Sequence, residues 1–522
     1  MRVKRSSRLV RRRKQRKEQL LKEHAETKIG DKVGDRLIAA NVDENVEFIG
    51  KLLGDGADVV TRFFTVQYTP DRRAAVMYID GLVDLSLIDR FVLSPLMTDA
   101  EKIKTKTDLW ELINESLIKT GETKVTARMK DLVEGILSGD TILLLDGESQ
   151  GLVIGSKGWP MRSVEEPKTA AVVRGPREGF SETIRVNTAL IRRRLRDPDL
   201  RMKGFKVGRR TRTDVTLCYI DGVADPKIVE EVEDRIRGIE LDGVLESGYI
   251  EEMIQDDFLS PFPLIQNTER PDAAVAHLLE GKVVILVDGT PHALIAPAVF
   301  SQFYCSPEDY YERYMIASFL RWLRLFALII ALLGPAFYIA FVSFHTEMLP
   351  SSLAIAMAAG RATVPFPSIA EALLMEISVE ILREASVRLP GPIGPTIGIV
   401  GALVIGEASV TAGLVSPLMV IVVGITTISS YANPSYNAAI SLRLLRFPIM
   451  IVAAGFGLYG IVLCLMLLLH HLVRLESFGV PYLAPMAPLR WEDLKDLLIR
   501  VPWSMMKKRP TIFRAEDQVR EE

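Results

Sequence analysis

The sequence predicts an α+β membrane protein, with a cytosolic, duplicated α/β region followed by an all-α transmembrane bundle of about four to six helices. Three observations lead to this fold class. Most of the charged residues, which are 25% of the 522, lie before Leu325. Long apolar runs begin only there, so the mean hydropathy of +0.19 averages two regions of opposite character. Apolar runs that end in Asp-Gly recur at a nearly constant interval before Leu325.

The chain begins with a basic arm. Residues 1–17 contain ten Lys or Arg and no acid, and no apolar stretch follows them, so they are not a secretory signal peptide. We expect residues 1–36 to be disordered. The arm either solubilises the cytosolic side of the protein or binds an anionic surface, and membrane lipid rather than nucleic acid is the expected partner.

The composition argues against metal and cofactor chemistry. Cys218, Cys305 and Cys464 are scattered, which fits a reducing compartment and makes neither a disulfide framework nor a metal-binding spacing. The six histidines are dispersed, and the sequence contains neither an HExxH motif nor a phosphate-binding P-loop. We therefore expect no metal ion and no cofactor.

One catalytic pattern matches by its letters. The residues GESQG at 147–151 fit the GxSxG nucleophile elbow, which requires a strand before the serine, here Ser149, and a helix directly after it. The residues that follow, GLVIGSKGWP, are too rich in glycine and β-branched side chains for a helix. We interpret the segment as a turn between two strands and expect no enzymatic activity.

The α/β pattern before Leu325 repeats. The residues YIDG occur at 78–81 and at 219–222, an offset of 141, and the Asp-Gly pairs at 146–147 and 288–289 are 142 apart. A β-rich run that ends in Asp-Gly is a strand entering a turn, because glycine accepts a positive φ and aspartate caps the turn. Two matched pairs at nearly one offset predict a duplicated unit. The two subdomains are expected at residues 37–165 and 166–300.

The segment from Ala171 to Arg196, between the two copies, has the pattern of a helix with a basic end. Cations at a helix C-terminus are favourable with the helix dipole. Four arginines within five residues, however, exceed what a helix end needs. The segment is either a solvated face or a contact surface for a partner or a neighbouring subunit. The candidate contact residues are Arg174, Arg192, Arg193 and Arg194.

We expect residues 301–475 to form the transmembrane domain. Residues 325–344 are twenty residues without a charge, which is the length that spans the hydrocarbon core of a bilayer. Arg313, Arg321 and Arg324 precede this run. The positive-inside rule therefore places the soluble half in the cytosol.

Two features of the apolar runs concern packing and bending. Gly334 and Pro335 lie in the middle of the first run, where proline would kink the helix and free a carbonyl, as a packing device or as a gating hinge. A second apolar region, residues 393–428, suits two spans or one span with a re-entrant piece. Small residues recur in it every four positions and would let helices approach closely in lipid. These are Gly394, Gly398, Ala402 and Gly406.

A last span is expected from about Phe447 to Leu469. Arg443 and Arg446 precede it, and basic residues also follow it, so the charge rule cannot orient it. Residues 476–522 are amphipathic and charged, and we expect them to form a cytosolic tail.

A helix near residues 368–388 carries the candidate ion-path residues. Glu376, Glu380 and Glu384 are four residues apart and are expected on one helix face. The helix either lies at the membrane interface with its acidic face solvated or lines a cation path in an oligomer, where rings of glutamate attract cations. Glu407 is a further candidate, because a carboxylate within an apolar segment is costly unless it is paired or hydrated.

Five stretches together carry a family resemblance. They are VVRGPREGFSETIRVNTALIRRR from Val172, SPFPLIQNTERPD from Ser260, SPEDYYERYMIASFLRWLR from Ser306, EISVEILREASVRLPGPIGPTIGIVGALVIGEASVTAGLVSP from Glu376, and RLLRFP from Arg443. In these stretches and in their order, the chain resembles the A subunit of the GerA-type nutrient germinant receptors of endospore-forming bacteria. The resemblance covers most of residues 45–475.

The resemblance implies a multi-pass protein of the spore inner membrane that acts with a transporter-like B subunit, thought to sense the nutrient, and a lipoprotein C subunit. It also implies a homo-oligomer that acts as a nutrient-gated cation channel at the start of germination. Two features depart from the family pattern. Glu407 stands where many relatives have Gln, and the basic arm exceeds the usual start of the family.

Two alternatives stay open at this point. One is a relative of the stage V sporulation protein AF type, an accessory to the release of small molecules from the spore core. The other is a membrane scaffold that conducts nothing and recruits partners through its α/β repeats.

Overall fold

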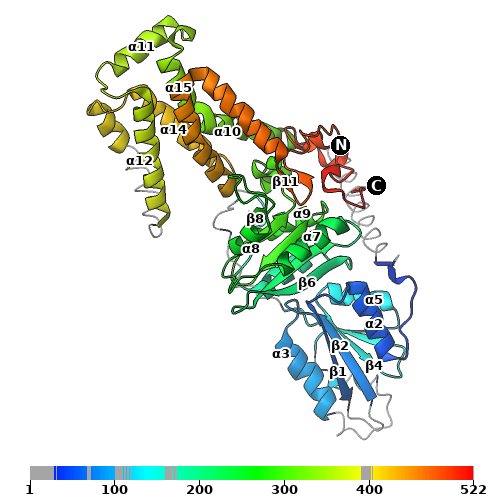
Figure 1. The fold of residues 1–522 in the computed structure, drawn as a ribbon. Helices are drawn as coiled ribbons and strands as arrows, with labels where there is room; N and C mark the ends of the chain where they lie inside the picture. Colours follow the sequence, from blue (N-terminus) through cyan, green and yellow to red (C-terminus); the bar gives the residue numbers. More distant parts are fainter. Residues whose placement is uncertain are drawn as a thin grey trace, which may run out of the picture.

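The computed structural model describes residues 29–30, 32–66, 72–99, 110, 113, 117–118, 120–158, 167, 172, 174–388, 401 and 404–520. Of the basic arm, it therefore describes residues 29–30 and 32–36. Two α/β subdomains follow one another, and a bundle of helices extends from the second (Figure 1).

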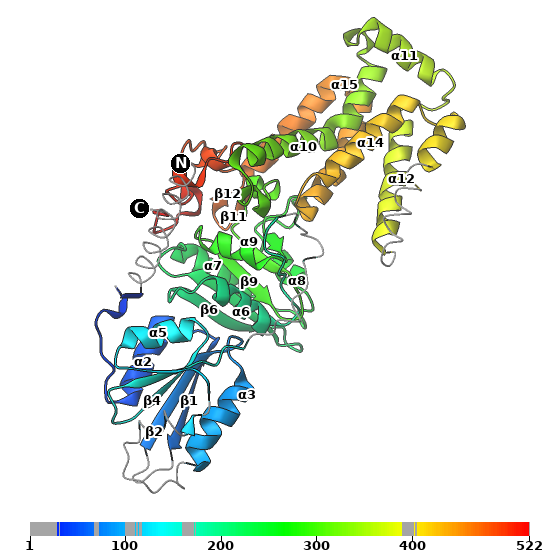
Figure 2. The same ribbon diagram turned by 180° about the vertical axis from the view of Figure 1, so that it is seen from behind.

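The first subdomain is a five-stranded sheet of order β1-β2-β4-β5-β3, in which neighbouring strands are antiparallel. Side chains alternate between its faces, so Ala74 and Val76 pack on one side while Ala75 and Met77 pack on the other. Helices α2 and α5 cover one face, and α3 with two π-helical turns covers the other (Figure 2). The bounds are α2 (Val42–Leu53), β1 (Val59–Val66), β2 (Arg72–Ile79), α3 (Leu85–Ile88), the π-helical turns (Asp89–Leu93 and Pro95–Asp99), β3 (Thr123–Thr126), α5 (Met129–Leu137), β4 (Thr141–Leu145) and β5 (Gly151–Ile154).

The second subdomain repeats this arrangement. Its sheet has the order β6-β7-β9-β10-β8, so each strand occupies the same place as its counterpart in the first sheet. Helices α6 and α9 cover one face, and α7 and α8 lie on the other. The bounds are α6 (Ile184–Arg194), β6 (Leu200–Val207), β7 (Thr213–Ile220), α7 (Pro226–Arg237), α8 (Ser247–Ile254), β8 (Gln266–Thr268), α9 (Pro271–Leu278), β9 (Val283–Val287) and β10 (Ala293–Ala296).

The two copies also share individual hydrogen bonds. The carboxylate of Asp146 accepts a hydrogen bond from the backbone N–H of Val42, and that of Asp288 accepts one from the N–H of Ile184. The aspartate of each Asp-Gly turn thus satisfies a free N–H at the first turn of α2 or α6. Because the two pairs are offset by the same 142 residues, the repeated motif seen in the sequence corresponds to a repeated structural contact.

The GESQG segment connects two antiparallel strands. β4 and β5 pair directly, and Gly147 has a positive φ of 85° in the turn between them. Ser149 is therefore followed by a strand, and a nucleophile elbow requires a helix at that place. The interpretation of this segment as a turn is confirmed.

The bundle has a near end, which contacts the second subdomain, and a far end, where α11 lies (Figures 1 and 2). Among the described residues, α10 and α15 are long and apolar enough to cross a membrane, whereas the apolar helix α14 has 15 residues. Residues 404–411 are also helical. The bounds are α10 (Tyr314–Ser343), α11 (Ser351–Arg361), α12 (Ser368–Arg388), α14 (Pro417–Tyr431) and α15 (Tyr436–Arg474).

Helix α15 turns back on itself at Gly457. This residue has φ 60° and ψ −141°, which only glycine adopts readily, and a straight helix of 39 residues would be about 58 Å long. Yet both ends reach the same loop of the second subdomain, because Ser441 donates a hydrogen bond to the carbonyl of Pro261 and the His471 ring lies 3.0 Å from the Ser260 hydroxyl. The single last span expected at residues 447–469 is therefore two shorter helices.

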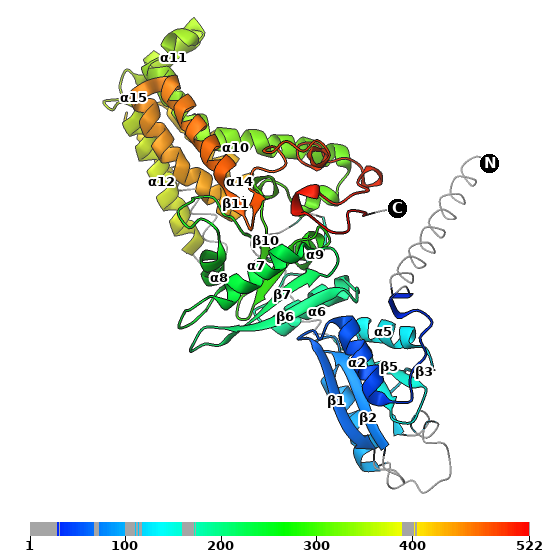
Figure 3. The ribbon, with the colours of Figure 1, turned by 45° about the vertical axis from the view of Figure 1, so that its right-hand side comes forward.

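The segment after α15 folds against the second subdomain. Phe478, Val480, Ile512 and Phe513 join the hydrophobic cluster between the sheet and α7. Figure 3 shows this segment, in red, between α10 and the second subdomain. The chain therefore enters and leaves the bundle at the near end. The segment contains β11 (Glu476–Ser477), β12 (Val480–Pro481) and short 3-10 turns at Asp493–Asp496, Trp503–Met505 and Thr511–Phe513.

Candidate functional site along helix α12

Helix α12 crosses the bundle from the far end to the near end and carries four glutamates. The hydroxyls of Ser343 and Ser368 lie 2.6 Å apart, which places the start of α12 beside the end of α10 at the far end. Three of its glutamates form ion pairs with arginines from other parts of the bundle, each at a different depth.

The first ion pair lies toward the far end. Glu371 is fully buried, and its carboxylate lies 3.0 Å from Nε of Arg361 in α11. The other oxygen of Glu371 accepts the backbone N–H of Ser416 at 3.1 Å. The hydroxyls of Ser416 and Tyr338 lie 2.8 Å apart, which extends the network to α10. This polar group therefore joins α10, α11, α12 and the start of α14.

The second ion pair lies in the middle of the bundle. Glu376 and Arg446 are both buried, and Nη1 of Arg446 donates to the carboxylate at 2.5 Å. Nε of Arg446 donates to the carbonyl of Ala331 in α10 at 2.7 Å. That carbonyl would normally accept the N–H of residue 335, but Pro335 has none. The freed carbonyl expected from the sequence is thus occupied by Arg446, and this contact ties α10, α12 and α15 together.

The third group lies toward the near end. The carboxylate of Glu380 lies 3.2 Å from Arg443 of α15 and 3.4 Å from Arg383, one helical turn further along α12. Arg383 also donates to the hydroxyl of Ser430 at 3.2 Å and lies over the ring of Tyr431, 4.7 Å from its centroid. Two guanidinium groups therefore share one carboxylate.

The three predicted ion-path glutamates of α12 do not have the same environment. The side chain of Glu376 is fully buried, that of Glu380 is 30% exposed, and Glu384 is exposed. A step of four residues turns a helix by about 40° more than a full circle, so the row winds around the helix. Glu407 is exposed. Sequence reasoning missed Glu371, which is buried like Glu376 and starts the row of ion pairs.

Gly334 and Gly406 lie at helix contacts. A Cβ at position 334 would lie 2.8 Å from the hydroxyl of Thr426, so the absence of a side chain on Gly334 allows α10 and α14 to approach closely. A Cβ on Gly406 would lie 3.3 Å from Val420 of α14. Helix α10 is continuous through Gly334 and Pro335. The other predicted packing residues, Gly394, Gly398 and Ala402, lie outside the described residues.

Arg192 joins the two α/β subdomains. Its side chain is 1% exposed, and its Nε and Nη2 donate to the Asp58 carboxylate at 2.6 and 3.1 Å. Asp58 precedes β1 of the first subdomain, whereas Arg192 lies in α6 of the second. Arg192, expected from the sequence on a solvated face or at a subunit contact, is therefore buried inside the chain. A bidentate pair of this kind fixes one geometry between the subdomains.

The other arginines of this segment are closer to the surface. Arg193 and Arg194 both donate to Glu178, and each has at least a fifth of its side chain exposed. Arg174 is exposed and lies 3.7 Å from Glu312. These contacts also lie within the chain.

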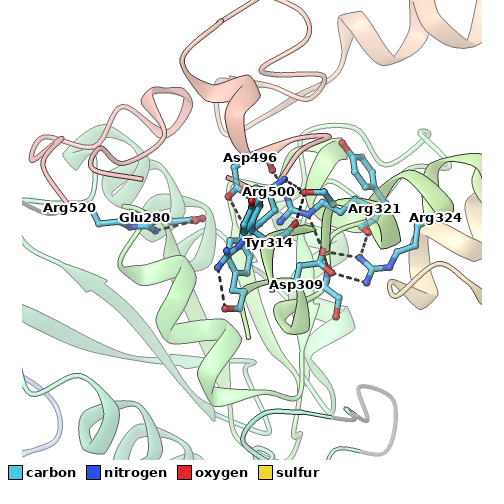
Figure 4. Close-up of polar contacts among 12 residues, drawn as sticks. Glu280, Asp309, Tyr314, Arg321, Arg324, Asp496, Arg500 and Arg520 are labelled. Carbon is cyan, nitrogen blue, oxygen red and sulfur yellow. Dashed lines mark hydrogen bonds and ion pairs between the residues drawn. The ribbon is translucent and has the colours of Figure 1, made fainter. Parts of the chain in front are cut away.

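A buried charge cluster fixes the base of α10 (Figure 4). Asp309, 1% exposed, accepts hydrogen bonds from Arg321 at 3.1 Å and from Arg324 at 2.8 Å. Arg321 also donates to Asp496 of the C-terminal segment at 2.8 Å. Burial raises the pKa of Tyr310 well above its ordinary value, so its hydroxyl stays protonated and donates to Asp496. The cluster connects the turn at Pro307–Tyr310, α10 and the C-terminal segment.

No group of three or more His, Cys, Asp or Glu side chains in the described part of the chain is placed to hold a metal ion. The contacts along α12 are ion pairs and hydrogen bonds between helices.

Comparison with known proteins identifies the family. The profile of the Bacillus/Clostridium GerA spore germination protein matches residues 47–512. The chain belongs to the GerA family. It is 44% identical over 479 residues to "Uncharacterized membrane protein YfkQ" of Bacillus subtilis (strain 168), covering 92% of each chain. It is 43% identical over 485 residues to "Spore germination protein KA" of the same organism, covering 93% of this chain and 89% of the relative.

A solved structure is also similar to this GerA-family chain. The crystal structure of the N-terminal domain of the A subunit of the Bacillus megaterium spore germinant receptor GerK3 is 36% identical and covers 51% of this chain and 98% of that domain, with a TM-score of 0.41. The family stated as a resemblance from five sequence stretches is thus confirmed by the profile and by the relatives.

Proposed function

We propose that this chain is the A subunit of a nutrient germinant receptor, which oligomerises in the spore inner membrane and passes cations when the nutrient is sensed. Its proposed partners are a transporter-like B subunit and a lipoprotein C subunit. The proposal is supported by membership of the GerA family across residues 47–512 and by relatives that are named spore germination proteins.

We infer a multi-pass topology with the α/β region in the cytosol. The chain enters the bundle through α10 and leaves it through α15 at the same end, so the number of crossings is even. Helices α10, α12 and α14 and the two halves of α15 each run between the two ends. The chain between the near end of α12 and the start of α14, beside Glu371 at the far end, has to return once, which gives six crossings. Arg321, Arg324 and Arg474 lie at the near end, which the positive-inside rule assigns to the cytosol.

The buried pair of Glu376 and Arg446 carries the mechanistic part of the proposal. Charged side chains inside an apolar bundle are costly and mark functional elements such as ion paths and gates. In the conformation described here both charges are paired, so Glu376 is closed off from any path for ions. We assign the pair the role of a latch that holds the channel closed. Opening would separate Arg446 from Glu376 and from the carbonyl of Ala331.

The other residues predicted from the sequence also have roles in the proposed channel. Glu384 and Glu407 are exposed and are the carboxylates that can face the ion path in the closed state. Gly334 and Pro335 are the hinge at which α10 bends when the latch opens. Arg174, with the exposed parts of Arg193 and Arg194, is the contact surface toward a neighbouring subunit.

The function is tested by cation flux. The receptor subunits are reconstituted together in liposomes, and nutrient-dependent K⁺ and Na⁺ flux is measured for the native chain and for the triple variant Glu376→Gln, Glu380→Gln and Glu384→Gln. Glu347→Gln is the control, because Glu347 is an exposed acid outside α12. We expect the triple variant to pass K⁺ before nutrient is added, because Glu376→Gln removes the charge that Arg446 pairs with in the closed state, and to lose the nutrient-dependent increase in flux. The control should keep the nutrient-dependent increase.

The other outcomes separate the alternatives. Unchanged flux in the triple variant would keep the channel but place its path away from α12. If the native complex passes no ion after nutrient is added, the channel is refuted, and the non-conducting scaffold takes its place.

A further inference from the structure

A groove of about 490 Å³ lies between α12, the helix at residues 404–411 and α14. Its walls are mostly apolar and include Met375, Val379 and Leu382 of α12 and Val420 and Val423 of α14. On α12 it extends from Met375 to Ser386, which is about 16 Å along the helix axis. That length is about half of the 30 Å hydrocarbon core and so corresponds to one leaflet.

The near end of this groove is cationic. Arg383 lines it, with its side chain 10% exposed, and packs over the ring of Tyr431. Arg383 and Arg443 share the carboxylate of Glu380, so two guanidinium groups face one carboxylate here, and Arg383 is the charged side chain among the described residues that line the groove. A guanidinium group in the lining favours an anionic group at this end of the groove.

A second polar feature lies deeper in the groove. The hydroxyl of Thr427 is buried and has no hydrogen-bond partner among the described residues. The neighbouring Thr426 and Ser430, in contrast, donate to backbone carbonyls of their own helix. The lining thus contains a free hydroxyl and the guanidinium group of Arg383, in addition to the apolar walls. Such a group is suited to an ester or phosphate oxygen of a ligand.

We propose that this groove binds one anionic phospholipid from the leaflet that faces the α/β region. The phosphate lies against Arg383 and Tyr431, and one acyl chain lies along the apolar walls of α12 and α14. The inference rests on the membrane placement proposed above. A lipid fits better than a helix of a second copy, because the groove is apolar along its length and charged only at the end that faces the headgroup layer.

The groove can be filled without disturbing the helices. Gly424 lines it, and a Cβ at this position meets no atom within 4 Å. Gly424→Leu should therefore occupy the space of the acyl chain. Gly455→Leu is the matched control, because Gly455 also lies in an apolar helix with open space at its Cβ and does not line the groove.

The test is native mass spectrometry of the purified full-length chain with added phosphatidylglycerol or phosphatidylcholine. We expect the native chain and Gly455→Leu to retain one phosphatidylglycerol, and Gly424→Leu to bind it at least tenfold more weakly. Arg383→Gln should lose about fivefold of the preference for phosphatidylglycerol over phosphatidylcholine, since one basic group near an anionic surface contributes about this factor. Arg383→Lys should keep the preference, which separates a loss of charge from a loss of fold.

Three results would overturn the proposal. Equal lipid binding by Gly424→Leu and Gly455→Leu would show that the groove is not the lipid site. Displacement of the bound species by glycerol phosphate alone would identify a soluble anion as its ligand. A lower oligomeric state of Gly424→Leu with unchanged lipid binding would assign the groove to a second copy of the chain. None of these readouts depends on ion flux, so they are independent of the test of channel function.

Discussion

Replacing Arg446 with methionine should destabilise the bundle strongly. Glu376 is 0% exposed and Arg446 is 1% exposed, so the substitution leaves a buried carboxylate without its counter-charge. An uncompensated buried charge costs about 3–5 kcal/mol. The carbonyl of Ala331 also loses its donor, because Pro335 cannot supply an N–H, and an unsatisfied buried carbonyl costs about 1–3 kcal/mol. We therefore expect Arg446→Met to lower the free energy of unfolding by about 4 kcal/mol or more.

The double variant Arg446→Met, Glu376→Leu separates these contributions. Without the carboxylate, only the unsatisfied carbonyl of Ala331 remains, so the free energy of unfolding should return to within about 2 kcal/mol of the native value. Both variants can be compared by SDS-induced unfolding in mixed micelles, followed by tryptophan fluorescence and circular dichroism. A single variant that loses less than about 1 kcal/mol, or a double variant less stable than the single one, would refute the energetic role of the pair.

Three further variants test other contacts. Gly457→Ala should lower the unfolding midpoint in the same micelles, because the φ of 60° is strained for alanine and the added Cβ would lie 2.7 Å from the His345 ring. Gly455→Ala is the control and should leave the midpoint nearly unchanged, because a Cβ at Gly455 meets open space. Asp58→Ala should cost about 3–5 kcal/mol by leaving Arg192 buried and unpaired, and faster limited proteolysis between the two subdomains would report it. Burial lowers the pKa of Lys282 to about 7, against about 10.4 in the unfolded chain. Between these two pKa values the unfolded state binds more protons than the native state, so the free energy of unfolding should rise from pH 7 to pH 10. Lys282→Met should be more stable than the native chain at pH 7 and should not show this rise. Equal pH profiles for the native chain and the Lys282 variant would contradict this expectation.

The duplication of the α/β region could be predicted from the sequence because its signal is local. Asp146 and Asp288 occupy equivalent turns, and the glycine that follows each one has a positive φ. Each aspartate also caps the helix at the start of its own repeat. A turn motif that recurs at one offset therefore marks a repeated structural unit.

The reversal of α15 was missed although its signals are present in the sequence. Basic residues flank both ends of the apolar run, which made the span impossible to orient by charge. The reversal explains this, because both ends lie at the near end of the bundle. Gly455, Gly457 and Gly460 in the middle of the run indicate the turn, and a Cβ on Gly460 would lie 2.7 Å from the carbonyl of Val452 in the opposite half.

The partners of the glutamates could not be predicted from one sequence. Glu376 and Arg446 are 70 residues apart, and their contact depends on how α12 and α15 pack. The same holds for the C-terminal segment, in which Phe478 and Phe513 reach one hydrophobic cluster from positions far apart in the chain. Helical periodicity places a carboxylate on a face, but only tertiary packing determines which arginine faces it.

The latch is tested most directly by K⁺ efflux from liposomes that contain the receptor with the double variant Arg446→Met, Glu376→Leu, in the absence of nutrient. This variant lacks both charges of the pair and is expected to fold. We expect efflux at least tenfold above that of the native complex and of the Glu347→Gln control. A folded, assembled double variant that retains K⁺ as well as the native complex would contradict the assignment of this pair as the latch.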